Sequence, residues 1–145
     1  MSQPPVMPVD KMNERISRCT FNKWLGLEVV AATSETLEAH ATWRDEMVGS
    51  PETGMAHGGI LAAIIDGIGS YVVMAATGLV GSTLDMRIDY HRGVRPGQIT
   101  AKGTILKAGR TISSADVHLY DTDGKLVTSG RVVYFLGGKQ PTNPA

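Results

Sequence analysis

The hydrophobic and polar positions near the start of the chain follow the spacing of a helix. Met12 and Ile16 lie one helical turn apart, and Gly26 is placed to end the helix. The ten residues before it include three prolines, a composition typical of a flexible arm. We therefore predict an N-terminal arm at residues 1–10 and one helix at about 11–25.

A second, longer helix is predicted from His57 to Thr77, with Gly78 at its end. Its apolar residues recur every four positions, and Asp66 is its only charged residue. Each glycine inside a helix costs on the order of 1 kcal/mol relative to alanine, so we expect another backbone to pack closely against this helix. A helix that is apolar on nearly all sides favours burial inside a protein over a membrane span that contains an aspartate.

Alternation of apolar and polar residues predicts six strands. Two of them precede the long helix as a hairpin, and four follow it as a meander; residues 44–56 are predicted as a loop. The fold class is therefore α+β, an antiparallel sheet wrapped around one long central helix. We expect one domain at 11–137 and a flexible tail at 138–145. The predicted strands cover residues 27–32, 37–43, 83–90, 99–105, 115–120 and 126–136.

Composition excludes several functional classes. The 145 residues contain 14 basic and 14 acidic side chains, so no overall field favours nucleic acid or an anionic membrane surface. The single cysteine, Cys19, excludes an internal disulfide framework and is typical of a reducing compartment, which predicts a cytoplasmic protein. His40, His91 and His118 lack metal-ligand spacing and a cysteine partner, so no metal is expected.

The start of the long helix combines residues suited to acyl chemistry. His57-Gly58-Gly59 would place unpaired backbone N–H groups at a helix N-terminus, where they can stabilise a developing oxyanion. Asp66 follows the histidine by nine residues and could act as a general base or as a nucleophile. Two plainer interpretations stay open at this point. The glycines would only permit tight packing, and Asp66 would only accept hydrogen bonds from a neighbouring chain.

The pattern G-x-x-H-G-G with an acid nine residues after the histidine, within TGMAHGGILAAIID, resembles the hotdog-fold thioesterases. The similarity is greatest to the branch that includes the phenylacetate-degradation thioesterases. Residues 82–86, 90–97 and 107–111 resemble further family segments, namely a strand, an Arg-Pro-Gly turn and a Lys-x-Gly-Lys/Arg-Thr turn. The resemblance covers about 21–136 and implies a hotdog fold and hydrolysis of an acyl- or aroyl-CoA to the free acid and CoA.

The resemblance also implies roles for individual residues. Asp66 would be the base or nucleophile, the Gly58 N–H would bind the thioester oxygen, and His57 would shape the turn. Thr83 matches a hydroxyl that positions water or contacts substrate. Contacts to substrate or coenzyme A are implied for Gly59, Arg92, Lys107, Gly109, Arg110 and Thr111. Coenzyme A enters as part of the substrate, and no other cofactor is implied.

Assembly follows from the same resemblance. We expect a homodimer with a continuous sheet, and a dimer of dimers that makes a homotetramer. Asp66 of one chain would then face Gly58 of the partner subunit across the dimer interface.

One departure from the family pattern and two rival functions remain. Many relatives carry an asparagine six residues before the histidine, where this chain has Pro51, with Ser50 beside it. The missing asparagine supports a non-catalytic acyl-CoA-binding or regulatory domain as one alternative. A hotdog enoyl-CoA hydratase is the other, although His57 before two glycines suits a turn better than a base.

Overall fold

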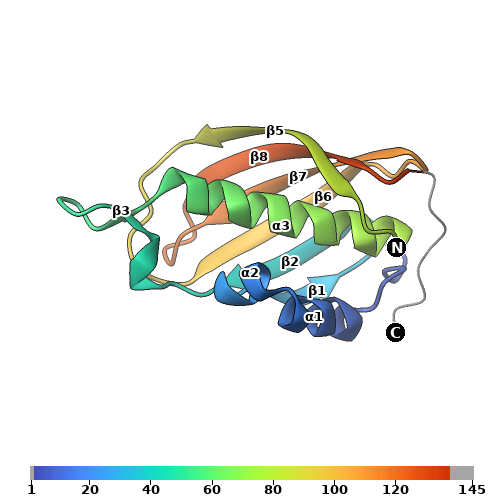
Figure 1. Ribbon diagram of the computed structural model, residues 1–145, viewed down its shortest axis with the longest axis horizontal. Coiled ribbons are helices and arrows are strands. Elements are labelled where there is room, and N and C mark those ends of the chain that lie inside the picture. Colours follow the sequence, from blue (N-terminus) through green and yellow to red (C-terminus); the bar gives the residue numbers. More distant parts are fainter. Residues whose placement is uncertain (1, 138–145) are drawn as a thin grey trace.

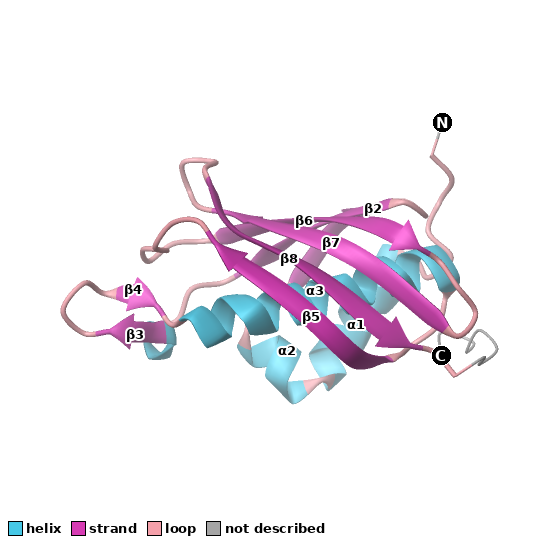
Figure 2. Cartoon of the chain, turned by 90° about the horizontal axis from the view of Figure 1, so that it is seen from above, coloured by secondary structure: helices cyan, strands magenta, loops and turns pink. Residues whose placement is uncertain are grey.

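Six strands form one antiparallel sheet, and helix α3 (Gly58–Thr77) packs across one face of it (Figures 1 and 2). This arrangement is seen in a computed structural model that describes residues 2–137, so the predicted tail at 138–145 lies outside the described residues. The layered arrangement confirms the α+β hotdog prediction. The strands are β1 (Glu28–Ala32), β2 (Thr36–Ala41), β5 (Ser82–Tyr90), β6 (Ile99–Lys107), β7 (Ile112–Tyr120) and β8 (Leu126–Phe135).

The strand order is β1-β2-β6-β7-β8-β5. Strands β6, β7 and β8 form a meander, but β5 pairs with β8 instead of β6. The prediction of a four-strand meander is therefore wrong for its first strand. Alternation shows which face of a strand is buried, but it does not identify the strand's neighbour. As a consequence, β1 and β5 are the two edges of the sheet.

Helix α3 forms the centre of the hydrophobic core, as predicted. His57 is its N-cap, and Gly78 ends it with a left-handed φ of 73°. The helix also has the length and hydropathy of a membrane span, but 56% of that stretch is buried inside the protein, so it serves as the core helix. Its apolar residues pack against inward-facing side chains of the sheet such as Val117 and Val132.

The small residues of α3 make room for side chains. A Cβ atom at Gly69 would collide with the hydroxyl of Tyr134 on β8, and one at Gly67 would lie 3.0 Å from Leu27 Cδ1. The expectation that another backbone approaches at these glycines is therefore wrong. At both positions a neighbouring side chain occupies the space that a larger residue would need.

The N-terminal helix is broken in two. Helix α1 (Val9–Arg18) and helix α2 (Thr20–Trp24) meet at Cys19, whose φ of −92° and ψ of 103° are extended. The single helix predicted at 11–25 is wrong at this residue. The spacing of apolar residues correctly predicted Met12 and Ile16 on the buried face of α1. The same spacing does not reveal the turn from α1 into α2.

The first described residues lie against the body of the protein. Met7 is buried, and the Val6 N–H donates a hydrogen bond to the Ala75 carbonyl at 2.7 Å. Asn13 of α1 binds both the N–H and the carbonyl of Val29 at 2.9 Å, which fixes α1 against β1. The flexibility of residues 1–10 stays a prediction.

The segment 44–56 has more structure than the predicted loop. It contains a short 3-10 helix η1 (Asp45–Met47) and a small hairpin of β3 (Val48–Ser50) and β4 (Met55–Ala56). These strands have two or three residues each, too few to produce a recognisable alternation. The hairpin leads directly into α3, because the His57 N–H donates to the Met47 carbonyl at 2.7 Å.

Candidate active site

The N-terminus of α3 has the geometry of an anion site. His57 Nδ1 accepts a hydrogen bond from the Gly59 N–H at 2.8 Å, which fixes the first helical turn. Gly58 is the first helical residue, so its N–H has no acceptor four residues earlier in the helix. The Gly58 carbonyl accepts a hydrogen bond at 2.7 Å from the hydroxyl of Tyr90 at the end of β5. Among residues 2–137 the Gly58 N–H has no hydrogen-bond acceptor, which makes it a candidate donor to a substrate oxygen.

Asp66 and Thr83 lie together on the side of α3 that faces β5. The Thr83 hydroxyl donates to Asp66 Oδ1 at 2.7 Å, and Asp66 is half-buried. Within residues 2–137 the second carboxylate oxygen, Oδ2, makes no hydrogen bond. A carboxylate held at one oxygen and open at the other is suited to accept a proton from a bound water.

Tyr134 fixes the backbone of Asp66 through a hydrogen bond. Its hydroxyl donates to the Asp66 carbonyl at 2.6 Å, so β8 is tied to the helical turn that carries the carboxylate. Burial, followed by the neighbouring Asp66 carboxylate, raises the pKa of Tyr134 far above its ordinary value. The phenol therefore stays protonated and remains a donor. Sequence reasoning missed this residue; it appears only as an inward-facing position of the last strand.

The predicted oxyanion donor, the Gly58 N–H, and the predicted base, Asp66, are far apart within one chain. Gly58 and Asp66 lie eight residues apart on the same helix, which corresponds to about 12 Å along its axis. A single thioester carbonyl cannot contact both groups at hydrogen-bond distance. The structure therefore brings Asp66 and Thr83 together, but not Asp66 and Gly58.

The residues predicted to contact coenzyme A also divide between two ends of the molecule. Lys107, Arg110 and Thr111 are exposed in the turn from β6 to β7, beside the end of β8, where the Leu136 N–H donates to the Thr111 carbonyl at 2.6 Å. Gly109, in the same turn, exchanges hydrogen bonds of 3.0 and 3.1 Å with the Ser113 hydroxyl.

The remaining two residues lie at the other end. Arg92 follows β5, and Gly59 lies in the first turn of α3. Both are exposed. Within one chain these positions do not form a common surface with the turn from β6 to β7.

The position of the missing asparagine lies next to His57, in the turn between β3 and β4. The Ser50 hydroxyl donates to Glu52 Oε2 at 3.2 Å, and Pro51 has no N–H to offer. Gly49 packs so closely on His57 that a Cβ there would lie 2.6 Å from His57 Cα. A role for Ser50 in place of the asparagine stays a prediction.

No cluster of three or more histidine, cysteine, aspartate or glutamate residues with metal-binding proximity exists in the part of the chain that the structure describes. His91 Nε2 lies 2.8 Å from the Ser129 hydroxyl. This histidine therefore has a hydrogen-bonding partner on a neighbouring strand.

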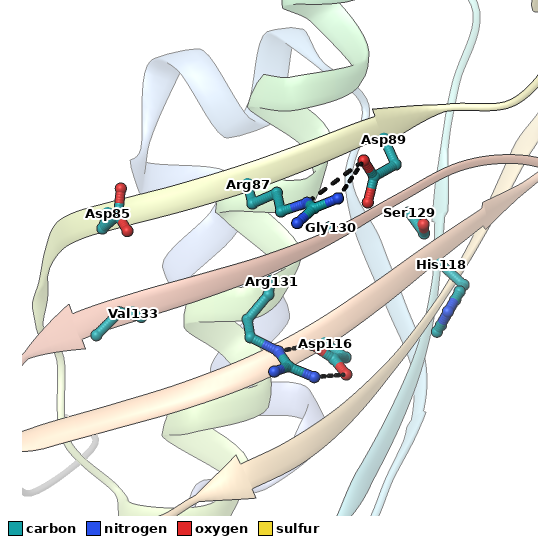
Figure 3. Close-up of a pocket in the computed structure, with 9 residues that line it drawn as sticks. All are labelled: Asp85, Arg87, Asp89, Asp116, His118, Ser129, Gly130, Arg131 and Val133. Carbon is teal, nitrogen blue, oxygen red and sulfur yellow. Dashed lines mark hydrogen bonds and ion pairs between the residues drawn. The ribbon is translucent and has the colours of Figure 1, made fainter.

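Two of the hollows in the surface lie on opposite faces of the sheet. The first has a volume of about 260 Å³ and lies along α3, where Asp66 and Thr83 line it; we call it the α3 cavity. The second has a volume of about 380 Å³ and lies on the outer face, across β5, β7 and β8 (Figure 3); we call it the outer hollow. Both of its arginines are paired: Arg131 binds Asp116 at 2.8 and 3.0 Å, and Arg87 lies 3.3 Å from Asp89. Asp85, on the same surface, has no ion pair among residues 2–137.

The model of the thioesterase superfamily matches residues 53–128, which span α3 and most of the sheet. The chain belongs to the thioesterase superfamily. The crystal structure of another protein of this superfamily superimposes with a TM-score of 0.83 at 38% identity, over 88% of this chain and 96% of the other. The prediction of a hotdog-fold thioester hydrolase is thus confirmed, whereas membership of the phenylacetate branch stays a prediction.

Two further relatives carry information about substrates. The medium/long-chain acyl-CoA thioesterase YigI of Salmonella typhimurium is 28% identical over 138 residues, which cover 81% of this chain and 85% of YigI. A hypothetical thioesterase protein from Streptococcus pneumoniae, solved with coenzyme A, has a TM-score of 0.71 at 26% identity over 79% of this chain and 88% of the other.

Proposed function

We propose that the protein hydrolyses an acyl-CoA thioester to the free acid and CoA. The observation that carries this proposal is the pair formed by Asp66 and Thr83, in which a half-buried carboxylate is held at one oxygen and open at the other. The acyl-CoA thioesterase activity named for YigI and the coenzyme A bound by the pneumococcal structure support the choice of substrate.

In the general-base form of the reaction, Asp66 accepts a proton from water while the water oxygen attacks the thioester carbonyl. The carbonyl oxygen becomes an oxyanion, and the backbone N–H of Gly58 of the partner subunit stabilises it. Collapse of the intermediate breaks the carbon–sulfur bond, and the CoA thiolate takes the proton from Asp66. In the alternative form, the Asp66 carboxylate attacks the thioester carbonyl and displaces the CoA thiolate, and water then cleaves the mixed anhydride to the free acid and the Asp66 carboxylate.

A homodimer explains why the site is divided within one chain. Strand β5 is a free edge of the sheet, and its Leu84 is 55% exposed, which favours pairing with a second copy. Antiparallel pairing through β5 would bring the α3 N-terminus and Arg92 of the partner subunit toward Asp66 and the Lys107 turn. The dimer of dimers and the cytoplasmic location are further parts of this proposal.

Thiol release from a panel of short, long and aromatic acyl-CoAs tests the reaction. We expect turnover by the wild-type protein and a loss of about 10²- to 10⁴-fold in Asp66→Asn, the usual contribution of a general base. Unchanged turnover in Asp66→Asn would refute the role of Asp66. Binding of acyl-CoA with no thiol release by wild type would favour the non-catalytic alternative.

The oxyanion role is tested by two substitutions at Gly58. Proline is tolerated at the first position of a helix; it removes the N–H and adds a ring with a Cβ, whereas alanine adds the Cβ and keeps the N–H. Either Cβ would meet the Tyr90 ring at about 3.2 Å, so the alanine variant controls for steric effects. We expect Gly58→Pro to lose about 10²- to 10³-fold in kcat and Gly58→Ala to lose far less.

Mixing the two kinds of variant tests the shared site. A hybrid dimer of an Asp66→Asn chain and a Gly58→Pro chain contains one intact pair of Asp66 and partner Gly58. Refolding an equal mixture should therefore recover activity that neither variant has alone. Failure of hybrid dimers to recover activity, with dimer exchange verified, would contradict a site divided between subunits.

The hydratase alternative is disfavoured by the hydrogen bond at His57. Its Nδ1 is already an acceptor for the Gly59 N–H, so in the neutral ring the proton lies on Nε2. A ring in that form has no free nitrogen to remove a proton from a substrate. Hydration of an enoyl-CoA without thiol release would restore this alternative.

A further inference from the structure

The α3 cavity continues past Asp66 to the N-terminal helices. Asp66 and Thr83 line it on the side of β5, while Arg15, Cys19 and Asn22 line it from α1 and α2. Figure 1 shows β5 and these two helices on opposite sides of α3. At about 260 Å³ the cavity is smaller than the roughly 300–1,000 Å³ of pockets that enclose drug-sized ligands. It therefore has room for an acyl group, but not for a whole CoA thioester.

The cavity changes character along its length. Besides its polar residues, the lining has apolar surface from Ala63, Met74 and Val80, and from Phe21, which is 53% exposed. Such a surface suits the methylene groups of an acyl chain. A chain that started at Asp66 would run over this apolar stretch and end against α1 and α2.

The far end of the cavity is polar and contains an unpaired cation. Arg15 is half-buried, and the four ion pairs among residues 2–137 do not include it. Tyr71 is only 1% exposed and also lines the cavity. Burial raises the pKa of Tyr71, and Asn22 and Arg15 offset only part of this effect, so the phenol stays neutral. The Arg15 guanidinium and the Asn22 amide, both hydrogen-bond donors, therefore line one cavity beside a neutral phenol.

A half-buried guanidinium without a partner is costly, and its planar group binds a carboxylate with two parallel hydrogen bonds. An alkyl chain end would leave the Arg15 guanidinium without a partner, whereas a carboxylate would pair with it. We propose, on the basis of the thioesterase function above, that the cavity accepts an ω-carboxyacyl group whose carboxylate binds Arg15.

Kinetic specificity tests the proposal. Glutaryl-, adipoyl- and suberyl-CoA are compared with alkanoyl-CoAs of the same chain length. We expect the wild type to have the higher kcat/KM for at least one ω-carboxyacyl substrate. Arg15→Met, which keeps length and removes charge, should lower that value by about 10- to 100-fold and lower the alkanoyl value far less. Arg15→Lys should lie between the two, because lysine keeps the charge and loses the paired geometry.

Arg18→Met provides the matched control. Arg18 lies in the same last turn of α1, is exposed and does not line the cavity. Arg18→Met should leave kcat/KM unchanged for both classes of substrate. A wild type that prefers alkanoyl substrates at every length would overturn the proposal. An equal loss on both classes in Arg15→Met would also overturn it and assign Arg15 a structural role.

Protection of Cys19 measures occupancy without turnover. Cys19 is the only cysteine of the chain and lines the cavity, so iodoacetamide reports on this place alone. In Asp66→Asn, adipoyl-CoA should slow its alkylation severalfold more than hexanoyl-CoA does, and Arg15→Met should abolish the difference. Protection without thiol release by wild type would refute the thioesterase and keep the binding site. Thiol release without selective protection would keep the thioesterase and refute the ω-carboxyacyl site.

Discussion

The outer hollow and the α3 cavity contain similar residue types in opposite arrangements. In the outer hollow both arginines have an acidic partner: Arg131 binds Asp116 across neighbouring strands, and Arg87 binds Asp89 along β5 (Figure 3). In the α3 cavity Asp66 binds only a hydroxyl, and Arg15 has no acidic partner within residues 2–137. The outer hollow is the larger of the two, at about 380 against 260 Å³.

We infer from this difference that the pairing of charged side chains is a better guide to function than the volume of a hollow. Exposed ion pairs on a sheet are already satisfied and contribute little to stability. A half-buried charged group without an ion-pair partner raises the free energy of the folded protein, and a bound ligand that pairs with it compensates for this. The smaller cavity is therefore the better candidate for chemistry.

The largest effect is expected from removing charge in the two hollows in turn. Asp66 and Asp116 are both half-buried aspartates, so Asp116→Asn is a matched control for Asp66→Asn. Thiol release should fall by about 10²- to 10⁴-fold in Asp66→Asn and stay within twofold of wild type in Asp116→Asn. A comparable loss in both variants would show that the distinction between paired and open charges fails.

The contact between α3 and Tyr134 is expected to respond to an increase in side-chain volume. Gly69→Ala would push its Cβ into the Tyr134 hydroxyl, a rigid group in the core, and should lower the free energy of unfolding by about 1–3 kcal/mol. Gly67→Ala is the matched control, because its Cβ would meet only the end of the Leu27 side chain and that of Asn22. Urea unfolding measures both. Equal stabilities would mean that Tyr134 does not fix the helix at Gly69.

A smaller effect is expected from the hydroxyl that holds Asp66. Thr83→Val removes the 2.7 Å hydrogen bond and keeps the shape, whereas Thr83→Ser keeps the hydroxyl. We expect kcat to fall about tenfold in the valine variant and to be largely retained in the serine variant. Full activity in Thr83→Val would show that the rest of the cavity positions Asp66.

The fold was predictable where periodicity and end signals agree. The α3 segment has a continuous apolar pattern, an N-cap at His57 and a glycine at Gly78, and its bounds were predicted to within one residue. The helix break at Cys19 and the pairing of β5 with β8 were not predictable in this way. Both depend on tertiary contacts, which a local pattern with a period of two or 3.6 residues does not reveal.

The site was predictable for residues that share one motif. His57, Gly58 and Asp66 are linked by a short spacing on one helix, and Thr83 was added through the family resemblance. Tyr134 and Arg15 reach the same cavity from the opposite ends of the chain. Nothing in their local sequence distinguishes a tyrosine that binds the Asp66 carbonyl from any other inward-facing strand residue.

The smallest effect concerns the pH dependence of stability. The raised pKa of Tyr134 means that the folded protein keeps a proton that the unfolded chain loses above about pH 10. Because the folded state then binds more protons, the free energy of unfolding should fall as pH rises beyond 10. Tyr134→Phe removes this contribution, so the free energy of unfolding of the variant should fall less steeply over the same range. The slopes of variant and wild type should differ by up to about 1.4 kcal/mol per pH unit. Tyr71→Phe should act in the same direction, since burial also raises the pKa of Tyr71. Urea unfolding from pH 7 to 11 measures the slopes, which should coincide with wild type below pH 9. Identical slopes above pH 10 would show that water reaches Tyr134, and the α3 cavity would then resemble the outer hollow more closely than the structure indicates.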